Sequence, residues 1–426
     1  MSGFDLMLTL GLVVLLLLGM PFAFSIGIAV VLALVIAEID TVVLVQHMMA
    51  GISIYTLLAV PCFILAGDLM HTGGLSRRLV VLAMVLARHF RGGLAMVAVL
   101  SATFFGAISG SAPATTAAIG KIMIPEMERH GYKRGFAAAL AAADGPIGIM
   151  IPPSIPMVIW AVIANVSVTD LFLAGIFPGL LCCVALCAVS SIYARVAQVP
   201  VDSRPASWGE VATAMKEGIW ALLAPVIVLG GIYGGVFTPT EAGAIGVLYG
   251  LVVGLFLHRE LKLGDLPVIV MRAMRTTAMV IFIVGMSAAF GWLVALEQLP
   301  ERLSGLILAF SDHPILILLV VNVLLLLVGA VMDTIAAMII LAGLLIQIGV
   351  QLGLDPIHFG AIVVVNLAIG MSTPPFGYTL FTAAGISDVS VERIVRYLWP
   401  MLIAQIAVLL LVTYVPAVTL TLPSLF

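Results

Sequence analysis

Two short segments, 144–153 and 366–375, combine polar side chains with helix-breaking prolines inside long apolar stretches. Asp144 in the first segment and Asn366 in the second are each followed by Ile-Gly and then by Pro-Pro at matching positions. Proline lacks a backbone N–H donor and clashes with the preceding helical turn, so neither pair fits inside a continuous helix. Backbone groups freed within hydrocarbon need polar partners. The pattern predicts two broken membrane helices that form a site for an ion or a small molecule.

Two further apolar regions, 92–124 and 314–350, have small or polar residues at their centres and predict re-entrant hairpins. The first centre reads Ser-Gly-Ser-Ala-Pro-Ala-Thr-Thr, and the second contains Asp333. A carboxylate at that depth costs about 2.5–3.5 kcal/mol on insertion scales, so it should have a partner. Hydroxyl, carbonyl and carboxylate oxygens are suitable ligands for a dehydrated alkali cation.

If each hairpin packs on its own broken helix, each pair holds one formal negative charge, from Asp144 or from Asp333. This arrangement predicts two Na⁺ sites. The predicted Na⁺ ligands are Ser109, Gly110, Ser111, Asp144, Gly148, Gly329, Asp333, Thr334, Asn366, Gly370 and Thr373. Helix N-termini after the breaks would attract an anionic substrate. The predicted substrate contacts are Pro113, Thr115, Thr116, Pro152, Pro153, Ser154, Ser372, Pro374 and Pro375.

Two other acidic residues in apolar segments have simpler interpretations. Asp68 precedes Arg77 and Arg78 and is expected to form an ion pair with them. Glu241 follows Thr238-Pro239-Thr240, a pattern typical of a helix N-cap. The four cysteines all lie in apolar segments and are expected to be free thiols, and we find no metal-binding spacing and no catalytic constellation.

Composition places these motifs in a polytopic membrane protein. Of the 426 residues, 63% are hydrophobic and 9% are charged, against about 25% charged in soluble domains. The mean hydropathy is +1.28. The N-terminus has no basic segment before its first apolar run and is interpreted as a span, not a cleaved signal.

The distribution of basic residues predicts the topology, because Lys and Arg accumulate on the cytoplasmic side. Ten crossings and two re-entrant hairpins place all but Arg302 of the 18 basic residues inside and both termini in the periplasm. We divide the chain into a first repeat at 1–196, a cytoplasmic connector with a short interfacial helix at 197–216, and a second repeat at 217–426. The broken helices are expected at 135–163 and 357–385.

The two halves are related by a nearly constant offset. Asp144 and Asn366 are 222 positions apart, and the Gly-Ala pairs at 106 and 329 are 223 apart. Each half has five crossings, an odd number, so the second half is inverted. Inverted repeats with broken helices are typical of secondary transporters.

Four motifs together resemble the large membrane (M) subunit of the TRAP, or tripartite ATP-independent periplasmic, transporters. They are the run from Gly148 to Pro156, the run from Ser109 to Thr115, Met332-Asp333, and the run from Asn366 to Gly377. The resemblance implies an all-α elevator-type transporter of the bacterial inner membrane. It also implies Na⁺-coupled uptake of an organic acid, such as a C4-dicarboxylate or a sugar acid.

The resemblance implies two protein partners: a small membrane (Q) subunit of about four helices and a periplasmic substrate-binding (P) protein. It implies no enzymatic activity, no cofactor besides the coupling Na⁺, and no nucleic acid. An alternative is a stand-alone Na⁺- or H⁺-coupled anion symporter. The hairpin tips here lack the Ser-Asn-Thr pattern of dicarboxylate/sodium symporters. An intramembrane aspartyl protease would need Gly-x-Gly-Asp, which neither Asp144 nor Asp333 provides. A scaffold without transport leaves the buried acids unexplained.

Overall fold

The computed structural model describes residues 11–425 except 13, 16, 17, 201–205, 300, 303 and 306–312. These residues form helices and no strands. The first predicted crossing lies largely outside the described residues. Helices of the first half are α2 (Phe22–Ile36), α3 (Val42–Ile52), α4 (Ala59–Thr72), α5 (Leu75–Ala87), α6 (Gly93–Ser109), α7 (Ala112–Arg129), α8 (Arg134–Asp144), α9 (Ile147–Met150), α10 (Ile155–Ala164) and α11 (Val168–Val196). Helices of the second half are α12 (Trp208–Tyr233), α13 (Pro239–Val252), α14 (Leu266–Leu296), α16 (Pro314–Val331), α17 (Thr334–Gln351), α18 (Pro356–Gly370), α19 (Tyr378–Ser387), α20 (Val391–Tyr414) and α21 (Ala417–Leu420).

Eight helices in the described part of the chain are long and apolar enough to cross a membrane. A ninth span results if the bent pair 134–150 and 155–164, which turns by 45°, is counted as one. The prediction of an all-helical polytopic membrane protein is confirmed.

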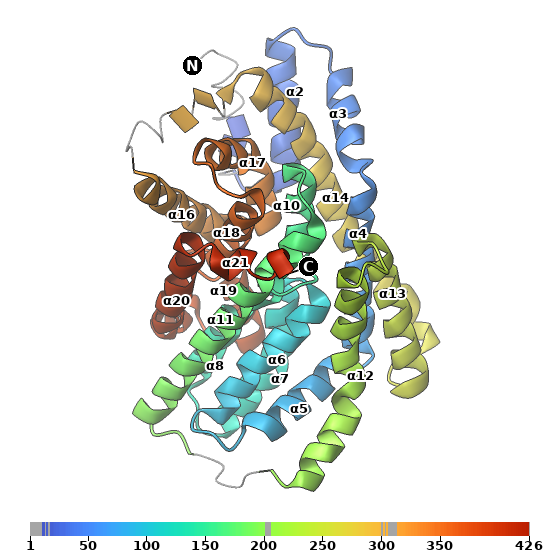
Figure 1. The fold of residues 1–426 in the computed structure, drawn as a ribbon, viewed down its shortest axis with the longest axis vertical. Coiled ribbons are helices and arrows are strands. Elements are labelled where there is room, and N and C mark those ends of the chain that lie inside the picture. The colour runs from blue at the N-terminus through green and yellow to red at the C-terminus, as the bar shows by residue number, and fades with distance from the viewer. Residues whose placement is uncertain are drawn as a thin grey trace.

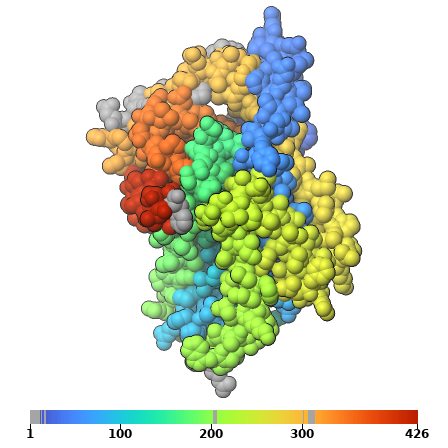
Figure 2. All heavy atoms as spheres, turned by 45° about the vertical axis from the view of Figure 1, so that its right-hand side comes forward, coloured from blue at the N-terminus to red at the C-terminus, as the bar shows by residue number. Residues whose placement is uncertain are grey.

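The helices form two groups, which lie side by side in Figure 1. We call α2–α5 and α12–α14 the frame, in which α13 packs on α4, α14 on α3, and α12 on α5. We call α6–α11 and α16–α21 the inner bundle. Figure 2 shows the frame's first helices and the 210–260 region as one continuous face. Large apolar side chains of this part of the chain are exposed, including Val45, Met49, Val226, Leu248 and Phe256, as expected of a surface within a membrane.

Each hairpin consists of two helices joined by a turn of two residues. Helices α6 and α7 meet at Gly110 and Ser111, and α16 and α17 meet at Met332 and Asp333. The first hairpin lies in the lower half of Figure 1 and the second in the upper half. The two tips therefore approach the middle of the molecule from opposite ends.

Helix α8, with the sequence RGFAAALAAAD, lies at the centre of the inner bundle. Every residue from Gly135 to Asp144 is buried. Its alanine side chains are small, so α7, α19 and α20 pack directly against it. This close packing brings the end of the helix, at Asp144, to the middle of the bundle.

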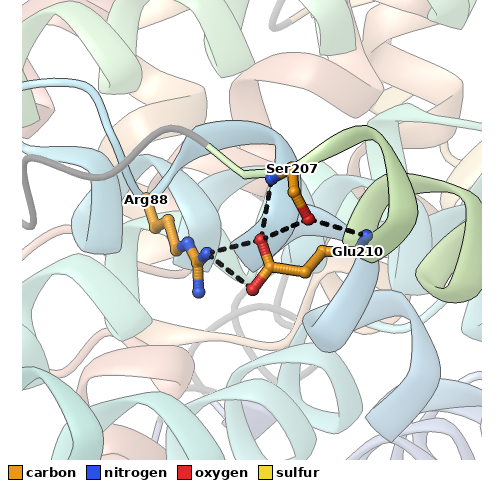
Figure 3. Close-up of polar contacts among 3 residues, drawn as sticks. All are labelled: Arg88, Ser207 and Glu210. Atoms are coloured by element: carbon orange, nitrogen blue, oxygen red, sulfur yellow. Dashed lines mark hydrogen bonds and ion pairs between the residues drawn. The ribbon is translucent and has the colours of Figure 1, made fainter.

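The connector between the halves differs from the prediction, because the short interfacial helix and the next span form one helix, α12. Its N-terminus has a capping box in which Ser207 Oγ accepts from Glu210 N–H and the Glu210 carboxylate accepts from Ser207 N–H. The Arg88 guanidinium donates to the same carboxylate at 3.1 Å (Figure 3). This polar cluster explains why the helix begins before the apolar segment does.

The expected pairing of Asp68 with Arg78 is wrong, because Arg78 Nη1 lies 2.7 Å from Glu260 Oε1. The expected cap at Thr238 is confirmed as a capping box with Glu241. Helices α3 and α5 were not anticipated as separate elements.

Candidate functional site

The first hairpin and the first broken helix touch backbone to backbone. A Cβ atom on Gly106 would lie 2.5 Å from Gly148 Cα, so only glycine permits this contact. At the tip, Ile155 N–H donates to Gly110 O at 3.4 Å. The hairpin tip is therefore held against both arms of the broken helix.

The second hairpin repeats this relationship with its own broken helix. A Cβ atom on Gly370 would lie 2.7 Å from Gly329 Cα. Thr334 Oγ1 donates to Leu367 O at 3.5 Å. The glycines that matched in sequence occupy equivalent contacts in the two halves.

Asp144 lies at the end of α8 and is 2% exposed. Neither carboxylate oxygen has a hydrogen-bond partner among the described residues, and the same holds for the neighbouring Thr116 Oγ1. Both residues line a cavity of about 10 Å³ together with Thr115. A buried unpaired carboxylate is costly, and a space of this size holds about one water. A single monovalent cation between Asp144 and Thr116 would satisfy these oxygens.

The hydroxyls of the first hairpin tip form a local network. Ser109 Oγ and Thr115 Oγ1 lie 3.1 Å apart, and Thr115 Oγ1 donates to Ser111 O at 2.8 Å. A Cβ atom on Gly148 would collide with Thr115 Oγ1. The network therefore faces the broken helix, and its Thr115 also lines the small cavity at Asp144.

Asp333 has a different environment from Asp144. It is the N-cap of α17, and its Oδ2 accepts from Ile335 N–H at 3.0 Å. It also lines the large cavity described below. The carboxylate is thus partly satisfied by the helix that it caps.

Asn366 belongs to a buried chain of side-chain hydrogen bonds. Its Nδ2 donates to Asn322 Oδ1 at 2.7 Å, and Asn322 Nδ2 donates to Thr413 Oγ1 at 3.0 Å. The chain links α18, α16 and α20. The amide nitrogen of Asn366 therefore holds α16 in place, while its Oδ1 has no partner among the described residues.

A cavity of about 440 Å³ lies where the two hairpin tips, both broken helices and the frame meet. Four helices begin beside it: α7 at Ala112, α10 at Ile155, α17 at Thr334 and α19 at Tyr378. The N-termini of α7 and α19 have no side-chain cap. Helix N-termini present unpaired N–H groups and a partial positive charge. The described lining contains no Lys or Arg and one carboxylate, Asp333. The uncapped N-termini of α7 and α19 are therefore the groups on this lining that could attract an anion.

The predicted substrate contacts are distributed unevenly around this cavity. Pro113 lines it, as do Gly110, Ser111, Asp333 and Thr334 from the predicted ion ligands. Thr115 and Thr116 line the small cavity instead. The remaining predicted substrate contacts lie in the two breaks and are absent from the described lining of the large cavity; they are Pro152, Pro153, Ser154, Ser372, Pro374 and Pro375.

The hydroxyls in the breaks bond to their own chain. Ser154 Oγ donates to Ile149 O at 2.7 Å. Ser372 Oγ and Thr373 Oγ1 both donate to Ile369 O, at 2.9 and 3.0 Å. The peptide bonds Pro152–Pro153 and Pro374–Pro375 are both cis. Each of these hydroxyls therefore satisfies a backbone carbonyl of the helix before its own break.

Sequence reasoning missed the residues that the frame contributes. Thr276, Met279, Val280 and Ile283 line the cavity from one face of α14. Their helical spacing is visible in the sequence, but it does not differ from that of any apolar helix. Gln405 was also missed; its Nε2 donates to Ala143 O at 2.9 Å, next to Asp144.

The hairpins, broken helices and central cavity define the class, a polytopic membrane transporter. The fold is similar to the crystal structure of the Alcanivorax borkumensis YdaH transporter. The TM-score is 0.60 at 15% identity, over 87% of this chain and 86% of that chain.

The chain belongs to the family described as the DctM component of the tripartite ATP-independent periplasmic transporters, which matches residues 9–418. It is 42% identical to the C4-dicarboxylate TRAP transporter large permease protein DctM of Pseudomonas aeruginosa, over 87% of this chain and 86% of that protein. It is 44% identical to the isethionate TRAP transporter permease protein DctMQ of Oleidesulfovibrio alaskensis, over 95% of this chain. The chain spans 64% of the length of that relative. These relatives are transporter permeases, so the chain is a transport component and not an enzyme.

Proposed function

We propose that this chain is a large permease subunit that carries a small organic anion across the bacterial inner membrane together with Na⁺. The observation that carries the proposal is the convergence of four helix N-termini on one cavity of about 440 Å³. Isethionate and C4-dicarboxylates, in the names of the two relatives, are small organic anions. An anion in this cavity would be stabilised mainly at the N-termini of α7 and α19, which have no side-chain cap, without a basic side chain.

Sodium coupling is supported by Asp144. Its buried carboxylate has no hydrogen-bond partner among the described residues, and a bound Na⁺ would offset that cost. We assign Asp144 and Thr116 to one ion. For a second ion we propose Asp333 and the backbone around Gly329 and Gly370, where the second hairpin contacts its broken helix. Each site would hold one carboxylate.

An elevator movement is supported by the make-up of the cavity walls. Hairpin tips and broken helices of the inner bundle form one side, and Phe22, Ile64 and the α14 face form the other. A rigid movement of the inner bundle along α14 would carry substrate and ions together. The apolar α14 face offers few polar groups that would resist this sliding.

Two partners complete the proposed transporter: a periplasmic binding protein that delivers the anion, and a small membrane subunit packed on the frame. The name DctMQ and the greater length of that relative are consistent with a small subunit fused to its large one. The exposed apolar frame surface offers area for such contact.

Uptake of a labelled organic anion into proteoliposomes tests the proposal. The chain would be reconstituted with its small membrane subunit, with the binding protein outside. We expect uptake under an inward Na⁺ gradient and none under an equal K⁺ gradient. Equal uptake in both gradients would refute sodium coupling. Full uptake without the binding protein would instead favour the stand-alone symporter.

A further inference from the structure

A third cavity, of about 220 Å³, lies away from the central site, between the end of α5, the base of the first hairpin and the connector. The chain passes here from the frame into the inner bundle, because residues 88–92 join α5 to α6. One water needs about 10–15 Å³ of such space, so the cavity has room for a ligand of several heavy atoms. Its lining includes Met84, Arg88, Phe90, Leu94, Glu126 and Tyr132.

The cavity is lined by a cationic and an anionic side chain that are only partly engaged. Arg88 Nη2 donates to the Glu210 carboxylate (Figure 3), but Arg88 Nε is buried and has no hydrogen-bond partner among the described residues. Glu126 Oε2 lies 3.4 Å from Arg129 Nη1, and Glu126 Oε1 lies 3.5 Å from His130 Nδ1. These distances exceed the usual range of about 2.7–3.2 Å. A free donor and a weakly paired carboxylate therefore line the same cavity.

Neighbouring side chains place this cavity at the level of lipid headgroups. Trp208, the first residue of α12, is 90% exposed, and tryptophan is enriched where hydrocarbon meets water. It lies two residues before Glu210, the partner of Arg88. Phe90 of the cavity lining and Leu86 of α5 are also exposed. Basic residues gather around the ends of α5 and α7, as is typical of the cytoplasmic side: Arg77, Arg78, Arg88, Arg91, Arg129 and Lys133.

We propose that this cavity binds the headgroup of a zwitterionic phospholipid of the cytoplasmic leaflet, one with a phosphate and a primary ammonium group, such as phosphatidylethanolamine. The phosphate would accept from Arg88 Nε–H, and the ammonium would donate to the Glu126 carboxylate. The acyl chains would lie over Met84, Phe90 and Leu94. Each half of the headgroup would then engage a protein group that is otherwise unpaired or weakly paired.

The two opposite charges distinguish this headgroup from the other common ones. Phosphatidylglycerol has the phosphate but no cation, so it would place a second anion near Glu126. Phosphatidylcholine has a quaternary ammonium without an N–H, so it cannot form a charge-assisted hydrogen bond with the carboxylate. Soluble glycerophosphoethanolamine has the same recognised groups as the lipid, but it lacks the acyl chains that would cover the apolar side chains.

Thermal unfolding of the delipidated full chain in detergent tests this inference with three dioleoyl lipids that differ only in the headgroup. We expect half-maximal stabilisation by the ethanolamine lipid at a concentration at least about tenfold below those for the glycerol and choline lipids. Equal concentrations for the three lipids would overturn the inference, as would stabilisation by none of them. Glycerophosphoethanolamine should have no effect over the same range. An equal effect of this soluble ester would assign the cavity to a soluble ligand and overturn the lipid assignment.

Glu126→Gln provides an independent arm, because it removes the partner of the ammonium at nearly unchanged size. The variant should lose the preference for the ethanolamine lipid over the glycerol lipid. Glu217→Gln is the control, because Glu217 is exposed on α12 and absent from the described lining of the cavity. The two lipids are compared within each protein, so a general loss of stability in a variant does not alter the result. A wild-type preference in Glu126→Gln would contradict the proposed role of this carboxylate.

Discussion

Thr379 Oγ1 lies 2.9 Å from Ala142 O, although the two residues are 237 positions apart. The same hydroxyl lies 2.9 Å from Met371 O. Ala142 precedes the first break, and Met371 follows the helix that ends at the second. One side chain therefore ties the two broken helices together, at a depth where their backbone groups need partners.

Replacing Thr379 with valine should destabilise the protein, because the shape is kept and the hydroxyl is lost. The buried Ala142 carbonyl would lose its side-chain donor, at a cost of about 1–3 kcal/mol. Met371 O would still accept from the Thr379 backbone N–H. Thermal unfolding in detergent measures the effect. Thr382→Val on the same helix is the control, since Thr382 Oγ1 is exposed and bonds only to Tyr378 O. Equal effects of the two substitutions would show that the hydrogen bond between Thr379 and Ala142 does not stabilise the protein.

Gly370→Ala should separate the second hairpin from its broken helix. The added methyl group would lie 2.7 Å from Gly329 Cα, which forces a backbone shift that typically costs about 1–3 kcal/mol. Gly385→Ala is the control, because nothing lies within 4 Å of its added carbon. We expect a lower unfolding temperature and slower uptake for Gly370→Ala but not for Gly385→Ala. A Gly370→Ala protein with unchanged unfolding temperature and uptake would show that the contact between Gly370 and Gly329 is not needed.

The effect of Asp144→Asn on stability should depend on the salt, with a loss in NaCl and no loss in KCl. In NaCl the wild-type protein gains stability from bound Na⁺, about 2.7 kcal/mol at a hundredfold excess over Kd, and the variant loses most of it. In KCl the variant should be at least as stable as the wild type, because it lacks a buried unpaired charge. Unfolding temperatures in the two salts measure this.

The control for that experiment is Asp170→Asn, in the first turn of α11, which should leave the difference between the salts unchanged. A wild-type protein with identical stability in NaCl and KCl would remove Asp144 from the proposed ion site.

Acidification should lower the stability of the protein through His258, which follows α13 and contacts the turn between α4 and α5. Its Nδ1 lies 3.0 Å from Gly73 O, and its Nε2 is buried without a partner among the described residues. Burial lowers the pKa of His258 and Arg78 lowers it further, while the Gly73 carbonyl and Glu260 act in the opposite direction. The unfolded chain therefore binds a proton more readily, and stability falls as the pH drops below about 6.5.

Unfolding temperatures between pH 8 and pH 5.5 test this effect in the wild type and in His258→Gln. The variant should show a shallower fall with acidification. Parallel curves for the two proteins would assign the acid sensitivity to other groups.

Much of the architecture was readable from local sequence. Apolar segments predicted the helices, and paired prolines predicted the breaks, because proline cannot continue a helix wherever it occurs. The matching positions of Gly106 and Gly329, and of Gly148 and Gly370, indicated the repeat, but not the contacts that these glycines make. Capping also follows from adjacent residues, so Thr238 and Glu241 were interpreted correctly.

Other features depend on which distant helices meet, and local patterns carry no information about that. Arg78 pairs with Glu260 and not with Asp68, because α5 begins beside the loop after α13. The α14 wall of the cavity, the Asn366–Asn322 bond and the Thr379 tie each join segments far apart in the chain. The sequence alone determined that the helices break and where the buried acids lie. Only tertiary packing decided which acid stays unpaired and which apolar face closes the cavity, because both depend on distances between separate helices.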